Sequence, residues 1–253
     1  MSIKRFWLAF TDQYGITPIH PQFIIKRLAH QAIEEAKNYT HGELIDIGCG
    51  RMAHRGELEK IATKYVGLDH PKLSKLYPSP RKPDIFGDAM ELPLQDATFD
   101  TALLLQVLEH LDDPQKALNE AYRILRKNGF IIISVPFMYP IHDAPYDYYR
   151  FTEHAIKKML KKAGFNIVKL QTGGSFLEFW VQSLIVYLFK KIDVKIKERI
   201  NPLGLLYLIS LFLIMSPIVI IINTLVWATS LFTNQSKYQS NDYVLNYTVV
   251  AQK

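Results

Sequence analysis

Only one cysteine, Cys49, occurs in the 253-residue chain, which has no internal repeat and no low-complexity tract. A lone thiol excludes an internal disulfide and fits a reducing compartment such as the cytosol. The first residues include basic side chains but only a short apolar stretch before Thr11 and Asp12, so we expect no signal peptide. A chain of this length suits one α/β domain with an appendage.

Charged side chains are missing from one long stretch, because no Asp, Glu, Lys, Arg or His occurs in residues 200–236. The chain as a whole is basic, with a net charge of +6, and a basic balance favours an anionic partner such as a membrane surface or a nucleic acid. The basic residues gather beside the apolar stretch instead of along an aromatic-rich strand. We therefore expect membrane lipid and no nucleic acid as a partner.

Short apolar runs alternate with amphipathic segments along most of the chain. The pattern predicts helices over residues 21–38, 55–65, 113–129 and 152–164, with Asp113 near one N-terminus, Thr152 as an N-cap, and Gly129 and Gly164 as stops. Strands are expected over residues 42–48, 65–69, 130–137, 165–172 and 243–253, with a short one ending at Gly87 and another that runs into a loop within residues 99–111. Such alternation predicts a mostly parallel, doubly wound sheet covered on both faces, with a ligand at the carboxyl ends of the strands.

The stretch LIDIGCGRMA holds a glycine turn directly after the first predicted strand. Gly48, Gly50 and Ala53 fit the loose spacing of dinucleotide-binding turns, and Asp69 ends the next strand, where an acid can accept hydrogen bonds from a ribose. Asp46 precedes the turn and places negative charge near the ligand, which would repel a pyrophosphate and favour a sulfonium.

Four sequence blocks together identify a family. ELIDIGCG, YVGLDH, GDAMELPLQDATFD and the run from LLLQVLEHL to IIISVPF resemble the motifs of class I S-adenosylmethionine-dependent methyltransferases, in the group called type 11. The resemblance covers residues 43–166 and resumes at 243. The chain departs from the family at Met52, where a third glycine is common, and in the apolar insert near its C-terminus.

The resemblance implies a seven-stranded Rossmann-like sheet and S-adenosyl-L-methionine as cofactor. It places Asp69 at the ribose, and Asp88 and Ala89 at the adenine. The cofactor-binding residues that it implies are Asp46, Gly48, Cys49, Gly50, Asp69, His70, Asp88, Ala89 and Gln106. Cys49 is interpreted as a small turn residue instead of a nucleophile, because its neighbours offer no partner that lowers a thiol pKa.

Candidate residues for the methyl acceptor follow the fourth and fifth predicted strands. Glu109 and His110 come after LLLQVL, and the segment YPIHDAPYDYYRF is dense in polar and aromatic side chains. A hydroxyl acceptor needs a base, for which we expect His142, with His110 and Asp143 as alternatives. Tyr148, Tyr149 and Arg150 are expected at the substrate, with Arg150 as an anion clamp or as the partner of Asp147 or Asp143. No metal site is expected.

The apolar insert spans residues 174–237 between the last two predicted strands. Residues 200–236 are long enough for a spanning helix, but residues 176–189 and each half around Pro217 are short for that. If the last two strands pair antiparallel, the chain crosses a membrane an even number of times or not at all. We expect a shallow or re-entrant hairpin with lysines at anionic headgroups. The alternatives are two spans, a dimer interface or an enlarged core.

The sequence thus predicts an N-terminal helical segment (1–40), a methyltransferase domain (41–173 and 238–253) and the insert. The expected function is methyl transfer at the cytoplasmic membrane surface to a small-molecule or lipid-linked acceptor, such as a glycan intermediate. A nicotinamide-dependent oxidoreductase and a non-catalytic membrane-bound module are the alternatives. The oligomeric state stays open.

Overall fold

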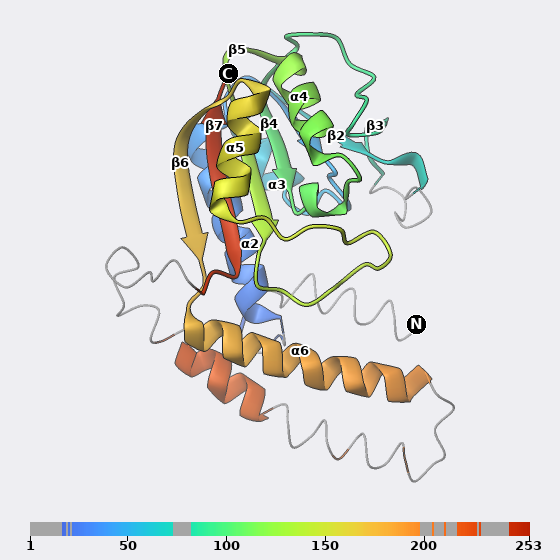
Figure 1. Ribbon diagram of the computed structural model, residues 1–253, viewed down its shortest axis with the longest axis vertical. Coiled ribbons are helices and arrows are strands. Elements are labelled where there is room, and N and C mark those ends of the chain that lie inside the picture. The colour runs from blue at the N-terminus through green and yellow to red at the C-terminus, as the bar shows by residue number, and fades with distance from the viewer. Residues whose placement is uncertain are drawn as a thin grey trace. The chain divides into compact units, whose positions relative to one another are not determined.

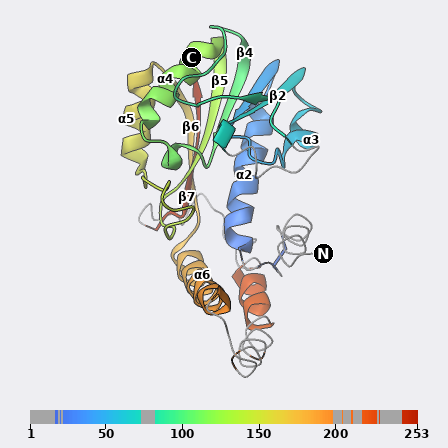
Figure 2. The same ribbon diagram turned by 90° about the vertical axis from the view of Figure 1, so that its right-hand side faces the viewer.

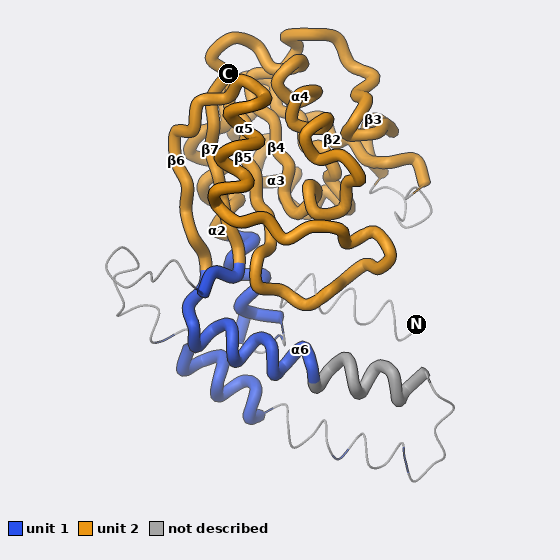
Figure 3. Tube along the Cα trace, viewed as in Figure 1, with its two compact units in different colours: residues 1–30, 174–245 blue, residues 31–173, 246–253 orange. Residues whose placement is uncertain are grey.

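The computed structural model describes residues 17–18, 20, 22–72, 82–197, 204, 210, 217–226, 228 and 243–253, with only the backbone for 188–197. The chain divides into two compact units (Figure 3). Residues 31–173 and 246–253 form the sheet unit, and residues 1–30 and 174–245 form the helical unit. The division at 173/174 lies where the sequence places the start of the insert. The division at 30/31 falls within one helix, α2 (Phe23–Tyr39).

The sheet unit is built on seven strands in the order β3-β2-β1-β4-β5-β7-β6 (Figures 1 and 2). The strands are β1 (Glu43–Ile47), β2 (Lys64–Asp69), β3 (Ile85–Phe86), β4 (Phe99–Leu105), β5 (Leu125–Pro136), β6 (Asn166–Gly173) and β7 (Asn246–Gln252). The first five strands pair in parallel, and β7 runs antiparallel to both β5 and β6. This confirms the predicted doubly wound methyltransferase sheet.

Helices cover both faces of the sheet. Helices α4 (Pro114–Ile124) and α5 (Glu153–Ala163) lie on one face, while α3 (Arg55–Leu58) and the part of α2 in the sheet unit lie on the other (Figures 1 and 2). On the α2 side, Ala36, Leu44 and Leu58 belong to one buried apolar cluster with Leu103 and Ile132. Burial on both faces explains why the central strands read as continuous apolar runs.

Short-range signals set several helix ends as expected. The side chain of Asp113 accepts a hydrogen bond from Lys116 N (3.0 Å), and that of Thr152 accepts one from Ala155 N (3.2 Å). Both are N-caps, which satisfy backbone donors that the first helical turn leaves unpaired. Gly164 ends α5 with φ of +100°, the left-handed conformation that favours glycine.

Two helices end earlier than the sequence predicts. Helix α3 stops at Leu58 instead of continuing to residue 65, because Thr63 N donates to Gly42 O (2.8 Å) and the chain enters β2 at Lys64. Helix α4 stops at Ile124, where Leu125 pairs with Phe99, so the predicted stop Gly129 lies within β5. In both places the pairing of a neighbouring strand outweighs local helix propensity.

In the helical unit, α6 (Phe176–Lys197) is longer than the expected apolar piece, and the described residues 217–226 form a second helical run. Most of the uncharged stretch 200–236 and its expected hairpin lie outside the described residues. Among the helices that are described, none combines the length and hydropathy needed to cross a bilayer.

The two strands that flank the insert pair antiparallel, as expected, and Gly173 at the end of β6 is the register partner of Asn246 at the start of β7. The insert therefore leaves the sheet and returns to it at neighbouring positions.

Gly164 provides a test of the α5 end. A Cβ at this glycine would lie 3.0 Å from ring atoms of Tyr122, in addition to the left-handed φ. We expect Gly164→Ala to lower the free energy of unfolding by about 1–2 kcal/mol. The matched control is Gly56→Ala, since no atom lies within 4 Å of its Cβ position and its φ is ordinary. The control should be neutral or stabilise the fold by up to ~1 kcal/mol. Urea unfolding followed by circular dichroism measures both, and equal effects would contradict this account of Gly164.

Candidate active site

The glycine turn joins the end of β1 to the start of the α3 region. Gly48 N and Cys49 N both donate to Leu68 O on β2, at 2.8 and 3.1 Å. Gly48 and Gly50 have φ values of +74° and +53°. A Cβ on Gly48 would lie 2.4 Å from a methyl of Val107, whereas a Cβ on Gly50 would meet no atom within 4 Å. Gly48 thus permits close packing of the turn, and Gly50 borders open space that a ligand can approach.

Asp69 at the end of β2 fixes this turn. Its Oδ2 accepts from Gly50 N (2.8 Å) and its Oδ1 from His70 N (2.6 Å). The side chain is buried. A carboxylate offers about four acceptor sites, so the group that orients the turn also has the capacity to accept hydroxyl donors from a ligand. His70 contributes its backbone here, and its ring Nδ1 accepts from Lys72 N (3.2 Å).

Met52 explains one departure from the family pattern. It has φ of +50°, which is a conformation that glycine adopts without cost. Its side chain packs against the buried apolar cluster on the α2 side. Met52 therefore keeps the backbone conformation that a glycine would adopt at this position, and its side chain adds to the core.

Asp46 lies beneath the turn and is bonded to a residue that the sequence did not single out. Tyr65 donates its hydroxyl to Asp46 Oδ2 at 2.5 Å within the core. Burial raises the pKa of Asp46 to about 6, and the Tyr65 hydrogen bond opposes that rise. Burial, with the charges of Asp46 and Asp69, also raises the pKa of the Cys49 thiol far above its ordinary value. A thiol held protonated is a poor nucleophile, which supports the interpretation of Cys49 as a turn residue.

The next two strands bring the other expected cofactor residues to the same edge. Asp88 follows β3 and accepts from Met90 N at 2.8 Å, which closes a turn around the buried Ala89. Gln106 follows β4 with φ of +57°. Its Nε2 donates to Ser134 Oγ on β5 and to Asn246 Oδ1 on β7, both at 2.9 Å. Gln106 therefore ties three strand ends together.

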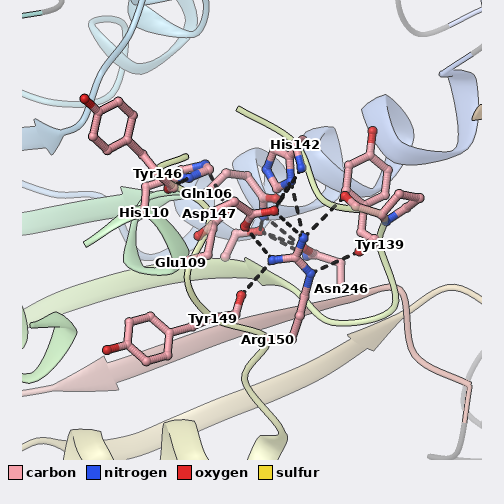
Figure 4. Close-up of polar contacts among 12 residues, drawn as sticks. Gln106, Glu109, His110, Tyr139, His142, Tyr146, Asp147, Tyr149, Arg150 and Asn246 are labelled. Atoms are coloured by element: carbon pink, nitrogen blue, oxygen red, sulfur yellow. Dashed lines mark hydrogen bonds and ion pairs between the residues drawn. The ribbon is translucent and has the colours of Figure 1, made fainter. Parts of the chain in front are cut away.

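A buried ion pair organises the loop of residues 139–151 after β5 (Figure 4). Arg150 donates Nη1 to Asp147 Oδ1 (2.6 Å) and Nη2 to Asp147 Oδ2 (2.7 Å), and the Asp147 side chain is only 1% exposed. The guanidinium keeps the pKa of Asp147 far below its usual range. Further hydrogen bonds from Arg150 go to the backbone oxygens of Tyr139, Pro140 and Tyr149.

These contacts bear on the expected role of Arg150. A guanidinium has five N–H donors, and every nitrogen of Arg150 already donates to an acceptor of this loop. The geometry favours the alternative in which Arg150 holds Asp147, over the anion clamp.

Two histidines and a glutamate meet beside the ion pair (Figure 4). The rings of His110 and His142 lie 5.0 Å apart in an edge-on contact, and Tyr139 packs edge-on against His142 at 5.2 Å. Glu109 is fully buried, which raises the pKa of its carboxyl to about 8. The structure thus brings together His110 and His142, two of the three candidate catalytic residues, from segments after different strands.

The remaining expected residues lie on the outer part of the loop. Tyr148 N and Tyr149 N both donate to Glu109 O (2.9 and 3.3 Å), and Tyr149 also donates its hydroxyl to Asp112 O (3.0 Å). Both tyrosine rings are exposed. Asp143, the third candidate base, is exposed and adopts a φ of +49°, and its backbone oxygen accepts from Tyr146 N. The loop backbone is therefore bound to Glu109, while its aromatic rings face outward.

Sequence reasoning did not identify Tyr65, Ser134 or Asn246, and it named Glu109 only as one base among several. Tyr65 lies 19 residues from Asp46, and Asn246 lies 140 residues from Gln106. Only the strand order brings such pairs together.

Comparisons with known proteins agree with this geometry. A protein-family model described as "Methyltransferase domain" matches residues 45–133. A Mycolicibacterium smegmatis protein named "Probable S-adenosylmethionine-dependent methyltransferase" is 26% identical over 187 residues, 65% of this chain and 70% of its own length. The 27-O-demethylrifamycin SV methyltransferase of Amycolatopsis mediterranei is 34% identical over 96 residues, 34% of this chain and 35% of its own length.

Solved structures show the same fold. A crystal structure of an S-adenosylmethionine-dependent methyltransferase from Archaeoglobus fulgidus aligns with a TM-score of 0.55 at 14% identity, over 98% of this chain and 100% of that one. The [4+2]-cyclase SpnF aligns with a TM-score of 0.56 at 19% identity, over 90% of this chain and 80% of that one. Because a cyclase shares the architecture, the fold alone does not assign a reaction.

The Asp46–Tyr65 bond predicts a pH-dependent effect on stability. Burial raises the pKa of Asp46 from 3.8 to about 6, so its ionisation costs stability as the pH rises through the window between these values. The hydroxyl of Tyr65 offsets part of that cost by stabilising the carboxylate. We expect Tyr65→Phe to destabilise the fold by about 1.5–3 kcal/mol near pH 7.5, and by less near pH 5, where Asp46 is largely protonated.

Thermal unfolding at the two pH values measures this difference. The control is Tyr39→Phe, because no hydrogen bond of the Tyr39 hydroxyl is found within the described part of the chain, and it packs against Phe130. Its effect should be the same at both pH values. A Tyr65→Phe effect that does not change with pH would contradict the proposed pairing with an ionised Asp46.

Proposed function

The chain carries a class I S-adenosylmethionine-dependent methyltransferase domain, and we propose that it methylates a lipid-like or lipid-linked acceptor at the cytoplasmic surface of a membrane. The cofactor assignment sets aside the nicotinamide alternative. The acceptor class and the membrane site rest on the polarity of the helical unit.

The residues at the strand ends fit S-adenosylmethionine. Gly50 borders open space, and the buried carboxylate of Asp69 stands beside it at the end of β2. Asp69 would hold the ribose hydroxyls, and the turn around Asp88 and Ala89 would hold the adenine. When bound, the cofactor supplies a methyl group already activated by its sulfonium. The protein then has to orient the acceptor in line with that methyl, which can contribute on the order of 7–11 kcal/mol.

The acceptor side is proposed to be the loop of residues 139–151 with His110 beneath it. The ion pair of Arg150 with Asp147 holds the loop, and His142 stands next to it with Nδ1 3.2 Å from Asp147 Oδ2. The exposed side chains of Ile141, Tyr146 and Tyr148 offer apolar contact to a hydrophobic molecule. His142 and His110 are the side chains that we propose to contact the acceptor oxygen, with Asp143 at the rim.

The observation that carries the membrane proposal is the exposed apolar face of α6. Among its described side chains, Glu178 and Gln182 are buried, at 6% and 1% exposure, whereas Trp180 and Tyr187 are 60% and 58% exposed. Phe176, Leu177 and Leu184 are exposed as well. Positions 176, 180, 184 and 187 recur at helical spacing, so these side chains share one face. The buried side of α6 holds Ile185 and Val186 together with Glu178 and Gln182. An exposed apolar face of this kind is unfavourable in water and favourable against lipid.

The second helical run repeats this pattern. Asn223 is fully buried, and its Nδ2 donates to Pro18 O (2.9 Å) and His20 O (3.2 Å). Ile218, Ile221 and Leu225 are exposed. The helical unit also buries the ion pair between Arg27 and Glu178. Two separate helices that bury polar groups and expose aliphatic ones indicate a unit whose surroundings are partly apolar.

Vesicle binding tests the membrane proposal. We expect Trp180→Glu with Leu184→Glu to weaken binding of the intact protein to anionic phospholipid vesicles by more than about 100-fold, because each apolar side chain lost from lipid forfeits ~1.5–3 kcal/mol. The control is Ile61→Glu, which places a charge at an exposed apolar position of the sheet unit. It should leave vesicle binding unchanged. Undiminished vesicle binding by the α6 variant, or a dimer that this variant converts to a monomer, would show that the face is a protein interface.

Asp69 tests the cofactor assignment. Asp69→Asn keeps the shape but removes the charge, so we expect S-adenosylmethionine to bind about 10- to 100-fold more weakly by calorimetry, the value of a charge-assisted hydrogen bond. Asp88→Asn should lose less, because one adenine contact is involved. Transfer of labelled methyl to a membrane extract should fall in parallel at limiting cofactor. Unchanged cofactor affinity in a folded Asp69→Asn protein would refute the ribose assignment.

A further inference from the structure

Glu109 presents a buried carboxyl group whose polar atoms are unsatisfied. The side chain is fully buried, and within the described part of the chain neither Oε1 nor Oε2 has a hydrogen-bond partner. Its Oε1 lies 3.8 Å from Nε2 of His110, beyond hydrogen-bond length. Unsatisfied buried oxygens are costly, so this arrangement calls for a partner that the protein atoms do not supply.

The two neighbouring imidazoles are each oriented by a contact at Nδ1. His110 Nδ1 lies 2.7 Å from Tyr146 O, and since a carbonyl oxygen only accepts, His110 carries its proton on Nδ1 and a lone pair on Nε2. His142 Nδ1 lies 3.2 Å from the buried carboxylate of Asp147, with Arg150 Nη2 at 3.4 Å. Arg150 Nη2 can only donate, so this hydrogen bond makes Nδ1 the acceptor. Metal binding through Nε2 requires the ring proton on Nδ1 instead, where the Asp147 carboxylate can accept it.

One ligand atom from each of Glu109, His110 and His142 lies within 4.8 Å of the other two. We propose that these three residues bind a divalent transition-metal ion of the zinc class. Two imidazoles and one carboxylate form a donor set that suits Zn²⁺, Co²⁺ or Mn²⁺. Ligands of a tetrahedral zinc lie about 3.4 Å apart, so the ion draws the three side chains closer together.

The surroundings supply what such a site needs beyond its ligands. Metal-bound histidines donate their second N–H to a carboxylate or a backbone carbonyl, and Asp147 and Tyr146 O provide one of each. The bidentate ion pair with Arg150 fixes Asp147, and the backbone of Glu109 is bound by Tyr148 N and Tyr149 N. The loop of residues 139–151 is thereby held over the two other ligands.

Three protein ligands leave at least one coordination position for an oxygen donor from outside the chain. The occupant that fits is a hydroxyl or carboxylate oxygen of the methyl acceptor, on which His110 and His142 then act through the ion instead of by direct contact. This link to methyl transfer rests on the proposed function, but binding of the ion by the three residues does not.

Metal binding to the intact protein, stripped with a chelator and without cofactor or acceptor, tests the site. Calorimetric titration with Zn²⁺ should give one ion per chain, and Co²⁺ should produce visible d–d absorption bands. Glu109→Gln and, separately, His142→Ala should each weaken Zn²⁺ binding on the order of 100-fold or more, because outer-shell partners alone are worth about 10- to 100-fold. The Co²⁺ bands should disappear in both variants.

The matched control is His154→Ala, which removes an exposed histidine on α5 and should leave the stoichiometry, the affinity and the Co²⁺ spectrum unchanged. Circular dichroism confirms that each variant is folded, and the half-buried His142 provides a variant that does not alter the core. Absence of stoichiometric Zn²⁺ binding by the natural protein would overturn the proposal. So would Zn²⁺ binding that persists in both ligand variants, or that is lost in His154→Ala.

Discussion

The site depends on one constraint, which is that five parallel strands end at the same edge of the sheet. The turn at Gly48 and Gly50 follows β1, Asp69 ends β2, and Asp88 follows β3. Gln106 follows β4, and the loop of residues 139–151 follows β5. Residues scattered over about a hundred positions thereby converge without a dedicated interaction for each. The antiparallel strand β7 adds Asn246 to this edge from the opposite direction, because its first residue pairs with Pro136 at the end of β5.

The common position of the strand ends does not fix the conformation of the loop of residues 139–151. The ion pair of Arg150 with Asp147 fixes it. Burying two charges costs several kcal/mol per ion, which good geometry and full hydrogen bonding must offset. Both conditions are met, since the pair is bidentate and the other N–H groups of Arg150 bond backbone oxygens of the same loop. Without Asp147, Arg150 would be left half-buried and His142 would lose the carboxylate beside it. The loop conformation and the orientation of His142 are therefore set by one interaction.

The sequence predicted those parts of the structure that short-range chemistry determines. Thr152 and Gly164 bracket α5 as expected because a cap and a left-handed residue act within one helical turn. The strand-end positions of Asp69 and Gln106 follow from the motif blocks. The early ends of α3 and α4 were not predicted, because strand pairing at Lys64 and Leu125 decides them. The bond from Tyr65 to Asp46 and the unsatisfied Glu109 could not be read from the sequence, because residue type does not reveal which polar groups the packed core leaves with a partner.

The two units both bury apolar side chains but differ in what their described elements expose. The sheet unit buries aliphatic strands such as β5, as a protein in water does. The described helices of the helical unit bury Glu178, Gln182 and Asn223 and expose Trp180, Tyr187 and Leu225. Amino-acid composition does not distinguish the two units, since both are rich in apolar residues. The exposure of the individual side chains distinguishes them. Of the buried polar groups on α6, Glu178 is paired with Arg27 within the unit.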